Sequence, residues 1–257
     1  MTLIGGALLR RFLFILILLF AFTAAGADHI PESVRAELAS LEQQYGVKFL
    51  IGEDVPPDNS GYVVSEYDPQ ERQGNLLHYM LTEKKTVTAD EQWCASFETL
   101  SAALARFPEG FLAALKDPLT ICVSGSIRDP ESSTLLGGFA MPQPAGRIYL
   151  NADNLSSDTV FHEIWHGIDL QQKDAFTTWN GLNPEGFAYT GDYVNYRSSP
   201  AFDPEYFAQP YGTVSPYEDR ATLFEAYMQN PPEWWEAHPK LQRKLEVMLK
   251  AVGWPES

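Results

Sequence analysis

Apolar residues recur at helical spacing in the first part of the chain. Between Pro31 and Tyr45, the residues Val34, Leu38 and Leu41 form one stripe and charged residues occupy the other side, which predicts a helix. A second helix is expected over residues 89–107, where large apolar residues recur at similar spacing. Both helices have one face that must be buried against another element.

Short apolar runs around these helices predict strands. Residues 47–51, 62–67 and 119–123 are such runs, bounded in part by Pro, Gly, Asn and Asp. Residues 137–141 and 147–151 flank a short connection that contains Pro and Gly, and they predict a hairpin.

A strongly patterned helix follows the predicted hairpin. A serine or aspartate at 156–158 can cap a helix in which Val160, Ile164 and Ile168 recur every four residues. Residues 172–215 are rich in Pro, Gly, Asn and Tyr and have little periodicity, so we interpret them as a loop region that faces the substrate. Two closing helices are expected over residues 216–229 and 233–252.

The N-terminal segment is typical of a signal peptide. Arg10 and Arg11 precede an apolar run from Phe12 to Phe22, and small residues follow it up to Ala27. We predict cleavage after Ala27 and export to the periplasm or the outside of the cell, with no stable membrane association afterwards. The alternative is an uncleaved N-terminal anchor. The chain then divides into a signal peptide (1–27) and two further portions, 28–135 and 136–257.

The charge of the expected mature chain limits its possible binding partners. The expected mature chain has 16 basic and 34 acidic residues, a formal charge of −18, so we expect no binding to nucleic acid or anionic lipid.

Cys94 and Cys122 are expected to form one disulfide in an oxidising compartment, with two buried free thiols as the alternative.

Residues His162-Glu163-Ile164-Trp165-His166 form an H-E-x-x-H motif on the patterned helix. Because residues four apart share a helix face, both imidazoles can bind one zinc ion. Glu163 is turned about 100° away, which lets its carboxylate act as the base on a zinc-activated water. The alternative is a chance pattern on a helix, and we interpret Trp165 as a core residue.

A catalytic zinc needs a third protein ligand and one open position. The extended H-E-x-x-H-x-x-G-x-x-H pattern is excluded, because Asp169 and Gln172 occupy the required positions. Two glutamates on the next predicted helix, Glu218 and Glu225, are seven residues apart and therefore share one face.

The segment from Tyr211 to Glu225 resembles the second half of the site in gluzincins related to anthrax lethal factor and the Pro-Pro endopeptidases. In those enzymes an E-x-x-A helix supplies the third zinc ligand and a tyrosine seven residues earlier faces the metal; Glu218, Ala221 and Tyr211 match that spacing. The resemblance implies a zincin-like α+β fold, with a mixed sheet above the active-site helix and a helical C-terminal part. It also implies one zinc ion, with Glu218 as ligand and Tyr211 as a hydrogen-bond donor to the oxyanion.

Other assignments around the site stay open. Ser215 and Glu218 also fit a capping box, which would explain the glutamate without a metal, and Glu225 is the reserve ligand. Residue 222 is not acidic, so Glu225 or Asp169 is expected to support a histidine. In zincins an edge strand, here 137–139, pairs with an extended peptide. We therefore predict an exported zinc metalloendopeptidase, with residues 28–135 as the N-terminal portion of the catalytic unit and residues 136–257 as the catalytic core. The alternatives are an idle zincin-like binding protein and a hydrolase of a non-peptide bond.

Overall fold

The structure is a computed structural model that describes residues 30–51, 54–56, 63–65, 89–128, 135–141 and 146–255. The expected signal peptide, residues 1–27, lies outside the described residues, as do His29 and His78. Within the described ranges, no helix combines the length and the apolar character needed to cross a membrane.

A mixed four-stranded sheet with the order β1-β3-β6-β5 forms the centre of the molecule. Strands β1, β3 and β6 are parallel, and β5 pairs antiparallel with β6, so the predicted hairpin is confirmed. A separate pair of short antiparallel strands, β2 and β4, lies outside this sheet. The strand bounds are Lys48–Ile51 (β1), Val63–Ser65 (β2), Thr120–Ser124 (β3), Ser126–Arg128 (β4), Gly138–Met141 (β5) and Arg147–Asn151 (β6).

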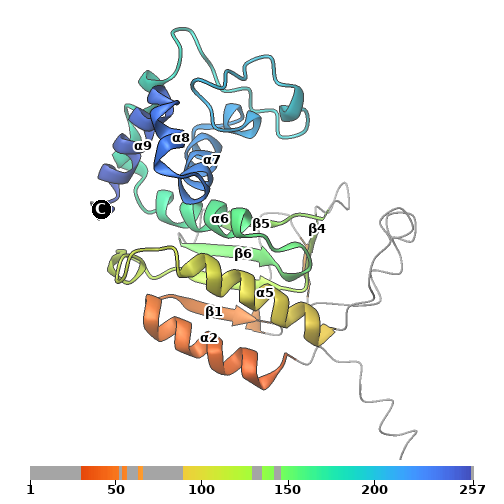
Figure 1. The fold of residues 1–257 in the computed structure, drawn as a ribbon. Coiled ribbons are helices and arrows are strands. Elements are labelled where there is room, and N and C mark those ends of the chain that lie inside the picture. The colour runs from red at the N-terminus through yellow and green to blue at the C-terminus, as the bar shows by residue number, and fades with distance from the viewer. Residues whose placement is uncertain are drawn as a thin grey trace, which may run out of the picture.

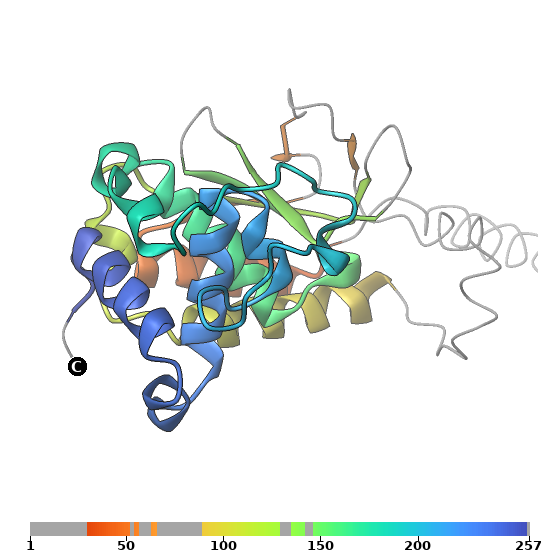
Figure 2. The ribbon, with the colours of Figure 1, turned by 90° about the horizontal axis from the view of Figure 1, so that it is seen from above.

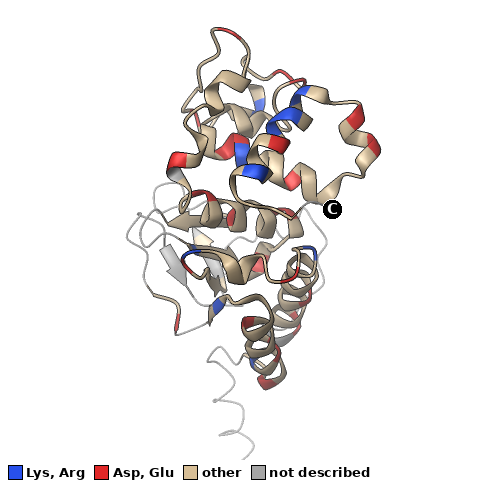
Figure 3. Cartoon of the chain, turned by 90° about the vertical axis from the view of Figure 1, so that its left-hand side faces the viewer, with Lys and Arg blue, Asp and Glu red and all other residues tan. Residues whose placement is uncertain are grey.

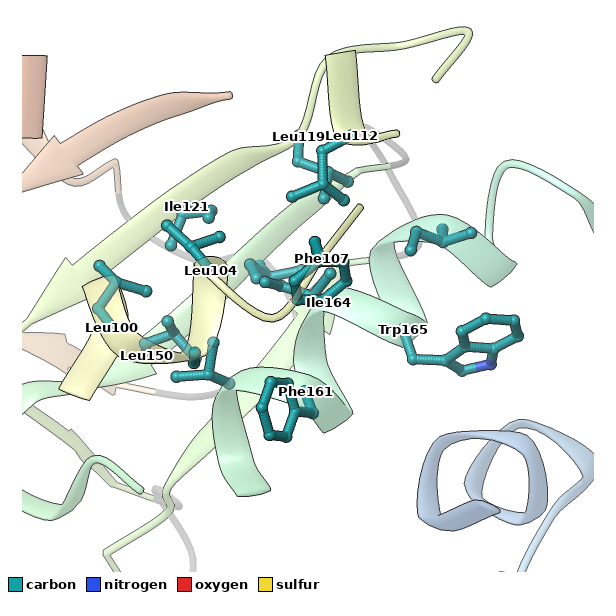
Figure 4. Packing of buried hydrophobic residues seen from close by; sticks show 14 of the residues in the cluster. Leu100, Leu104, Phe107, Leu112, Leu119, Ile121, Leu150, Phe161, Ile164 and Trp165 are labelled. Carbon is teal, nitrogen blue, oxygen red and sulfur yellow. The ribbon is translucent and has the colours of Figure 1, made fainter. Parts of the chain in front are cut away.

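Three helices pack with the sheet around the main hydrophobic core: α2 (Glu32–Tyr45), α5 (Ala89–Leu104) and α6 (Ser157–Asp169). Figure 4 shows Leu100 and Leu104 of α5 packed beside Ile121 of β3 and Leu150 of β6. Because this core includes residues from both sides of position 135, the N-terminal portion and the catalytic core of the sequence prediction share it. The coarse α+β class is confirmed.

The C-terminal helices lie on the side of α6 that faces away from the sheet (Figures 1 and 2). Helix α7 (Pro216–Gln229) has the predicted bounds and is followed by α8 (Pro232–Glu236) and α9 (Pro239–Ala251). The single helix expected over 233–252 is therefore wrong. Pro239 has no N–H to continue a helix and instead occupies the first turn of α9, with His238 as the N-cap.

Both cysteines are free thiols, so the expected disulfide is not formed. Successive side chains of a strand point to opposite faces. Ile121 and Val123 of β3 therefore join the main core, whereas Cys122 between them belongs to a smaller cluster. Cys94 on α5 packs against the main core, so the two thiols belong to different clusters.

The region between α6 and α7 is built from tight turns rather than regular elements. It contains four short 3-10 helices, namely Lys173–Phe176, Trp179–Leu182, Tyr196–Ser198 and Pro210–Thr213 (η7). The sequence prediction of a long irregular segment here is confirmed; its contact with a substrate stays a prediction.

Candidate metal centre

Helix α6 presents the two motif histidines on one face. Ser156 caps the helix by accepting a hydrogen bond from the Thr159 N–H at 3.2 Å. The imidazoles of His162 and His166 meet edge to face, with ring centroids 4.6 Å apart and Nε2 atoms 3.0 Å apart. Two histidines four residues apart thus aim their Nε2 atoms at one point.

Helix α7 brings a carboxylate to the same point. Oε2 of Glu218 lies 3.0 Å from His162 Nε2 and 3.2 Å from His166 Nε2. In a tetrahedral zinc site with bonds of about 2.0–2.1 Å, neighbouring ligand atoms lie about 3.3 Å apart. The triangle formed by the two nitrogens and the oxygen therefore has the size and the donor chemistry for one zinc ion.

The position of Glu218 also tests the capping-box explanation. Ser215 Oγ does accept a hydrogen bond from the Glu218 N–H at 3.2 Å, so the serine caps α7. The glutamate carboxylate, however, turns to the two histidines instead of completing the reciprocal bond to the serine. The cap accounts for the serine but not for the buried carboxylate of Glu218, which faces the two histidines.

Two buried contacts near the histidines hold α6 and α7 together. Arg220 Nε on α7 donates to Asp169 Oδ2 on α6 at 2.7 Å, and both side chains are buried. The rings of Trp165 on α6 and Phe224 on α7 lie 4.8 Å apart, and Trp165 points from α6 toward the C-terminal helices (Figure 4). The assignment of Trp165 to the core is confirmed, and Asp169 supports the helix pair rather than a histidine.

Glu225 lies two helical turns beyond Glu218 on α7. It contacts the other ring nitrogen of His162, Nδ1. Its Oε1 hydrogen bonds to His162 Nδ1, and its Oε2 accepts from Gln209 Nε2 at 2.5 Å. Because an ionised carboxylate only accepts, Nδ1 carries the hydrogen and Nε2 is turned to the metal centre. The sequence did not predict a role for Gln209, because this residue lies in the irregular segment and belongs to no motif.

Glu163 lies beneath β5, which is an edge strand of the sheet. Its side chain is buried, and Oε2 has no hydrogen-bond partner in the part of the chain that the structure describes. An added Cβ at Gly138 on β5 would lie only 2.7 Å from Glu163 Cγ. The absence of a side chain at position 138 therefore makes room for a carboxylate that keeps an oxygen free to accept a proton.

The charges of the site shift several pKa values. Burial opposes a charged His162, but the hydrogen bonds that its ring donates to the carboxylates of Glu218 and Glu225 raise its pKa to about 10. Burial opposes a charged Glu218 as well, yet the bonds to the two histidines lower its pKa to about 2. Burial raises the pKa of Glu163 to about 7. The cluster therefore favours a positive charge between the nitrogens, and Glu163 has a pKa suited to a base near neutral pH.

Tyr211 stands beside the histidines on η7. The centroid of its ring lies 5.9 Å from the centroid of the His162 ring, and the two ring planes are inclined by 28°. Burial, followed by the nearby carboxylates of Glu218 and Glu163, raises the pKa of Tyr211, so the phenol keeps its proton. An added Cβ at Gly212 would meet Thr222 Oγ1 on α7 at 2.9 Å, which shows how closely this turn packs on the helix.

A buried network fixes the irregular segment to α7. Asp219 Oδ2 accepts hydrogen bonds from Trp179 Nε1 at 2.9 Å and Tyr189 OH at 2.7 Å. Lys244 on α9 forms an ion pair with the same carboxylate, with Nζ 2.7 Å from Oδ2. The residue next to Glu218 thus ties the segment that carries Tyr211 to two helices.

The structure brings together all five residues of the predicted site and Glu225. The remaining described histidine, His238, hydrogen bonds to Trp234 O at the start of α9 and is not part of the group. Comparison with models of protein families, with curated proteins and with solved structures finds no match to this chain. The functional argument therefore rests on the chemistry of the site.

Proposed function

We propose that this chain is a zinc-dependent peptidase of the gluzincin type, with a zincin-like fold, that acts outside the cytoplasm after removal of residues 1–27. The observation that carries the proposal is the convergence of His162, His166 and Glu218 with 3.0–3.2 Å between their ligand atoms. A zinc ion, when bound by these three residues, supplies a Lewis acid that polarises the peptide carbonyl and acidifies a water.

The protein groups then divide the remaining work. Glu163, whose side chain is buried and keeps one oxygen free of hydrogen bonds from the described residues, takes a proton from the attacking water and passes it to the leaving amine. Tyr211 keeps its proton and donates a hydrogen bond to the oxygen that gains negative charge. Glu225 holds His162 in the tautomer that leaves Nε2 free for the metal.

The edge of the sheet supports a peptide as the substrate. Strand β5 is one of the two outer strands of the four-stranded sheet and runs directly over Glu163. An extended peptide that pairs with β5 would add a strand and bring its backbone carbonyls to the site. A peptide bond is therefore the bond we expect to be hydrolysed.

The test combines metal content with hydrolysis. Purified protein from residue 28 onward is expected to carry about one zinc ion per chain. Glu218→Ala is expected to lose the zinc, whereas Glu163→Gln keeps it and loses hydrolysis of a quenched fluorescent peptide library. If the wild-type protein binds no zinc at neutral pH, or binds zinc and cleaves no peptide, the proposal is wrong.

A further inference from the structure

The turn formed by residues 192–198, here called the 192–198 loop, lies beside the metal centre. The ring centroid of Tyr196 lies 4.7 Å from that of Tyr211, and the ring centroid of Tyr193 lies 6.2 Å from it. Tyr211 in turn lies beside His162. The loop therefore forms a wall next to the tyrosine that we assign to the oxyanion.

The loop is anchored at both ends to the segment that carries Tyr211. Before it, the Thr190 and Gly191 N–H groups donate to the carbonyls of Thr213 and Val214 at 2.9 Å and 3.0 Å. After it, Thr213 Oγ1 donates to Ser199 Oγ at 3.0 Å. Its side chains are thus held in place relative to the site.

The loop exposes two neighbouring apolar side chains. Tyr193 is 54% exposed and Val194 is 83% exposed. Exposed apolar groups that cluster beside a candidate active site are typical of a surface that binds a ligand.

The same loop carries an unusual charge. Arg197 is the one basic residue between positions 174 and 219, a stretch that holds seven acidic residues. Its Nε donates to Tyr196 OH at 3.4 Å, and it has no carboxylate partner among the described residues. Among the described residues that follow it, Arg220, Lys240 and Lys244 each pair with a carboxylate, whereas Arg243 on α9 has no carboxylate partner either. Figure 3 shows acidic residues, in red, along the C-terminal part of the chain. Arg197 lies in the loop beside Tyr211, and its guanidinium can bind a carboxylate of a ligand.

We infer that the 192–198 loop selects the substrate: Arg197 binds a carboxylate of the peptide, and Tyr193 and Val194 cover an apolar side chain next to it. The substrate class is a peptide that carries an apolar residue beside an acidic side chain or a free C-terminal carboxylate. This inference rests on the proposed peptidase function. The planar guanidinium matches a carboxylate in a bidentate arrangement, which explains an arginine here better than a lysine.

The experiment measures kcat/KM of the zinc-loaded protein for matched quenched peptides. One set places Asp, Asn or Lys beside a Leu, and a second set has a free or an amidated C-terminus, which separates the two sources of the carboxylate. The wild-type protein is expected to prefer a carboxylate peptide by about tenfold over its neutral match. Arg197→Glu is expected to abolish this preference and favour the Lys peptide, while the exposed Arg243→Glu, which makes the same change in net charge, leaves it unchanged.

The outcomes separate the two proposals. If the wild-type protein cleaves peptides but ignores the carboxylate, or if Arg197→Glu keeps the wild-type preference, the substrate inference is overturned and the peptidase proposal stands. If the zinc-loaded wild-type protein cleaves none of the library, the proposed function fails and this inference fails with it. Tyr193→Ala is expected to lower kcat/KM for the Leu peptide relative to the same peptide with Ser in place of Leu. If this ratio is unchanged, the inference that the loop covers an apolar side chain is overturned.

Discussion

Replacing Gly138 by alanine is expected to displace the proposed base without touching the metal ligands. The added Cβ would lie 2.7 Å from Glu163 Cγ and 2.7 Å from the carbonyl oxygen of Tyr149. Ordinary contacts between carbon atoms are about 3.5–4.0 Å, so the Glu163 side chain must shift by about 1 Å. A shift of that size in a reacting group costs roughly 100-fold in rate.

The expected result is a specific loss of activity. For Gly138→Ala, kcat/KM for peptide hydrolysis is expected to fall about 100-fold. Because the carbonyl of Tyr149 belongs to β6 and cannot move freely, we also expect about 1–3 kcal/mol of destabilisation. The zinc content should stay at the wild-type level, since no ligand side chain is among the atoms that the new Cβ meets.

The assay is steady-state hydrolysis of a quenched peptide, with zinc content and urea unfolding measured on the same samples. Gly181→Ala is the matched control, because a Cβ at Gly181 meets nothing within 4 Å. A folded, zinc-loaded Gly138→Ala protein with wild-type kcat/KM would refute the reasoning, because either Glu163 would not be the base or its position would not matter.

Three further predictions concern the surroundings of the site. Glu225→Gln is expected to weaken zinc affinity about 10–100-fold by loosening the bond to His162, measured by competition with a chelator; an unchanged affinity would contradict its role. In the zinc-free protein the folded-state pKa values of His162 and Glu163 are raised to about 10 and about 7, so both contribute stability at low pH that is lost as pH rises through those values. The urea midpoint should therefore decrease as the pH is raised from about 4.5 to about 10, and a midpoint that stays constant or increases would argue against these shifts. Lys244→Met leaves the buried Asp219 carboxylate unpaired and is expected to cost about 3–5 kcal/mol in urea unfolding, partly recovered by adding Asp219→Asn; a wild-type free energy would show that the pair is dispensable.

Much of the local structure followed from the sequence. The bounds of α7, the hairpin of β5 and β6, and the Ser156 cap of α6 all match the predictions. These features depend on periodicity, caps and turn residues within a few positions of one another. The wrong prediction of one helix over 233–252 also concerns a local signal, because Pro239 marks the break between α8 and α9.

The sequence by itself determined which side chains of the candidate site share a helix face. The spacing of His162 and His166 and the spacing of Glu218 and Glu225 both follow from helix geometry. Spacing within one helix, however, does not tell how two helices are rotated against each other.

Only the tertiary structure decided how the two helices meet. The buried pair of Asp169 and Arg220 joins α6 to α7 and sets Glu218 at the Nε2 atoms and Glu225 at Nδ1 of His162. Contacts between residues far apart in the chain also placed Gln209 beside Glu225 and separated the two cysteines. Such distances depend on the packing of the whole core, which no local pattern encodes.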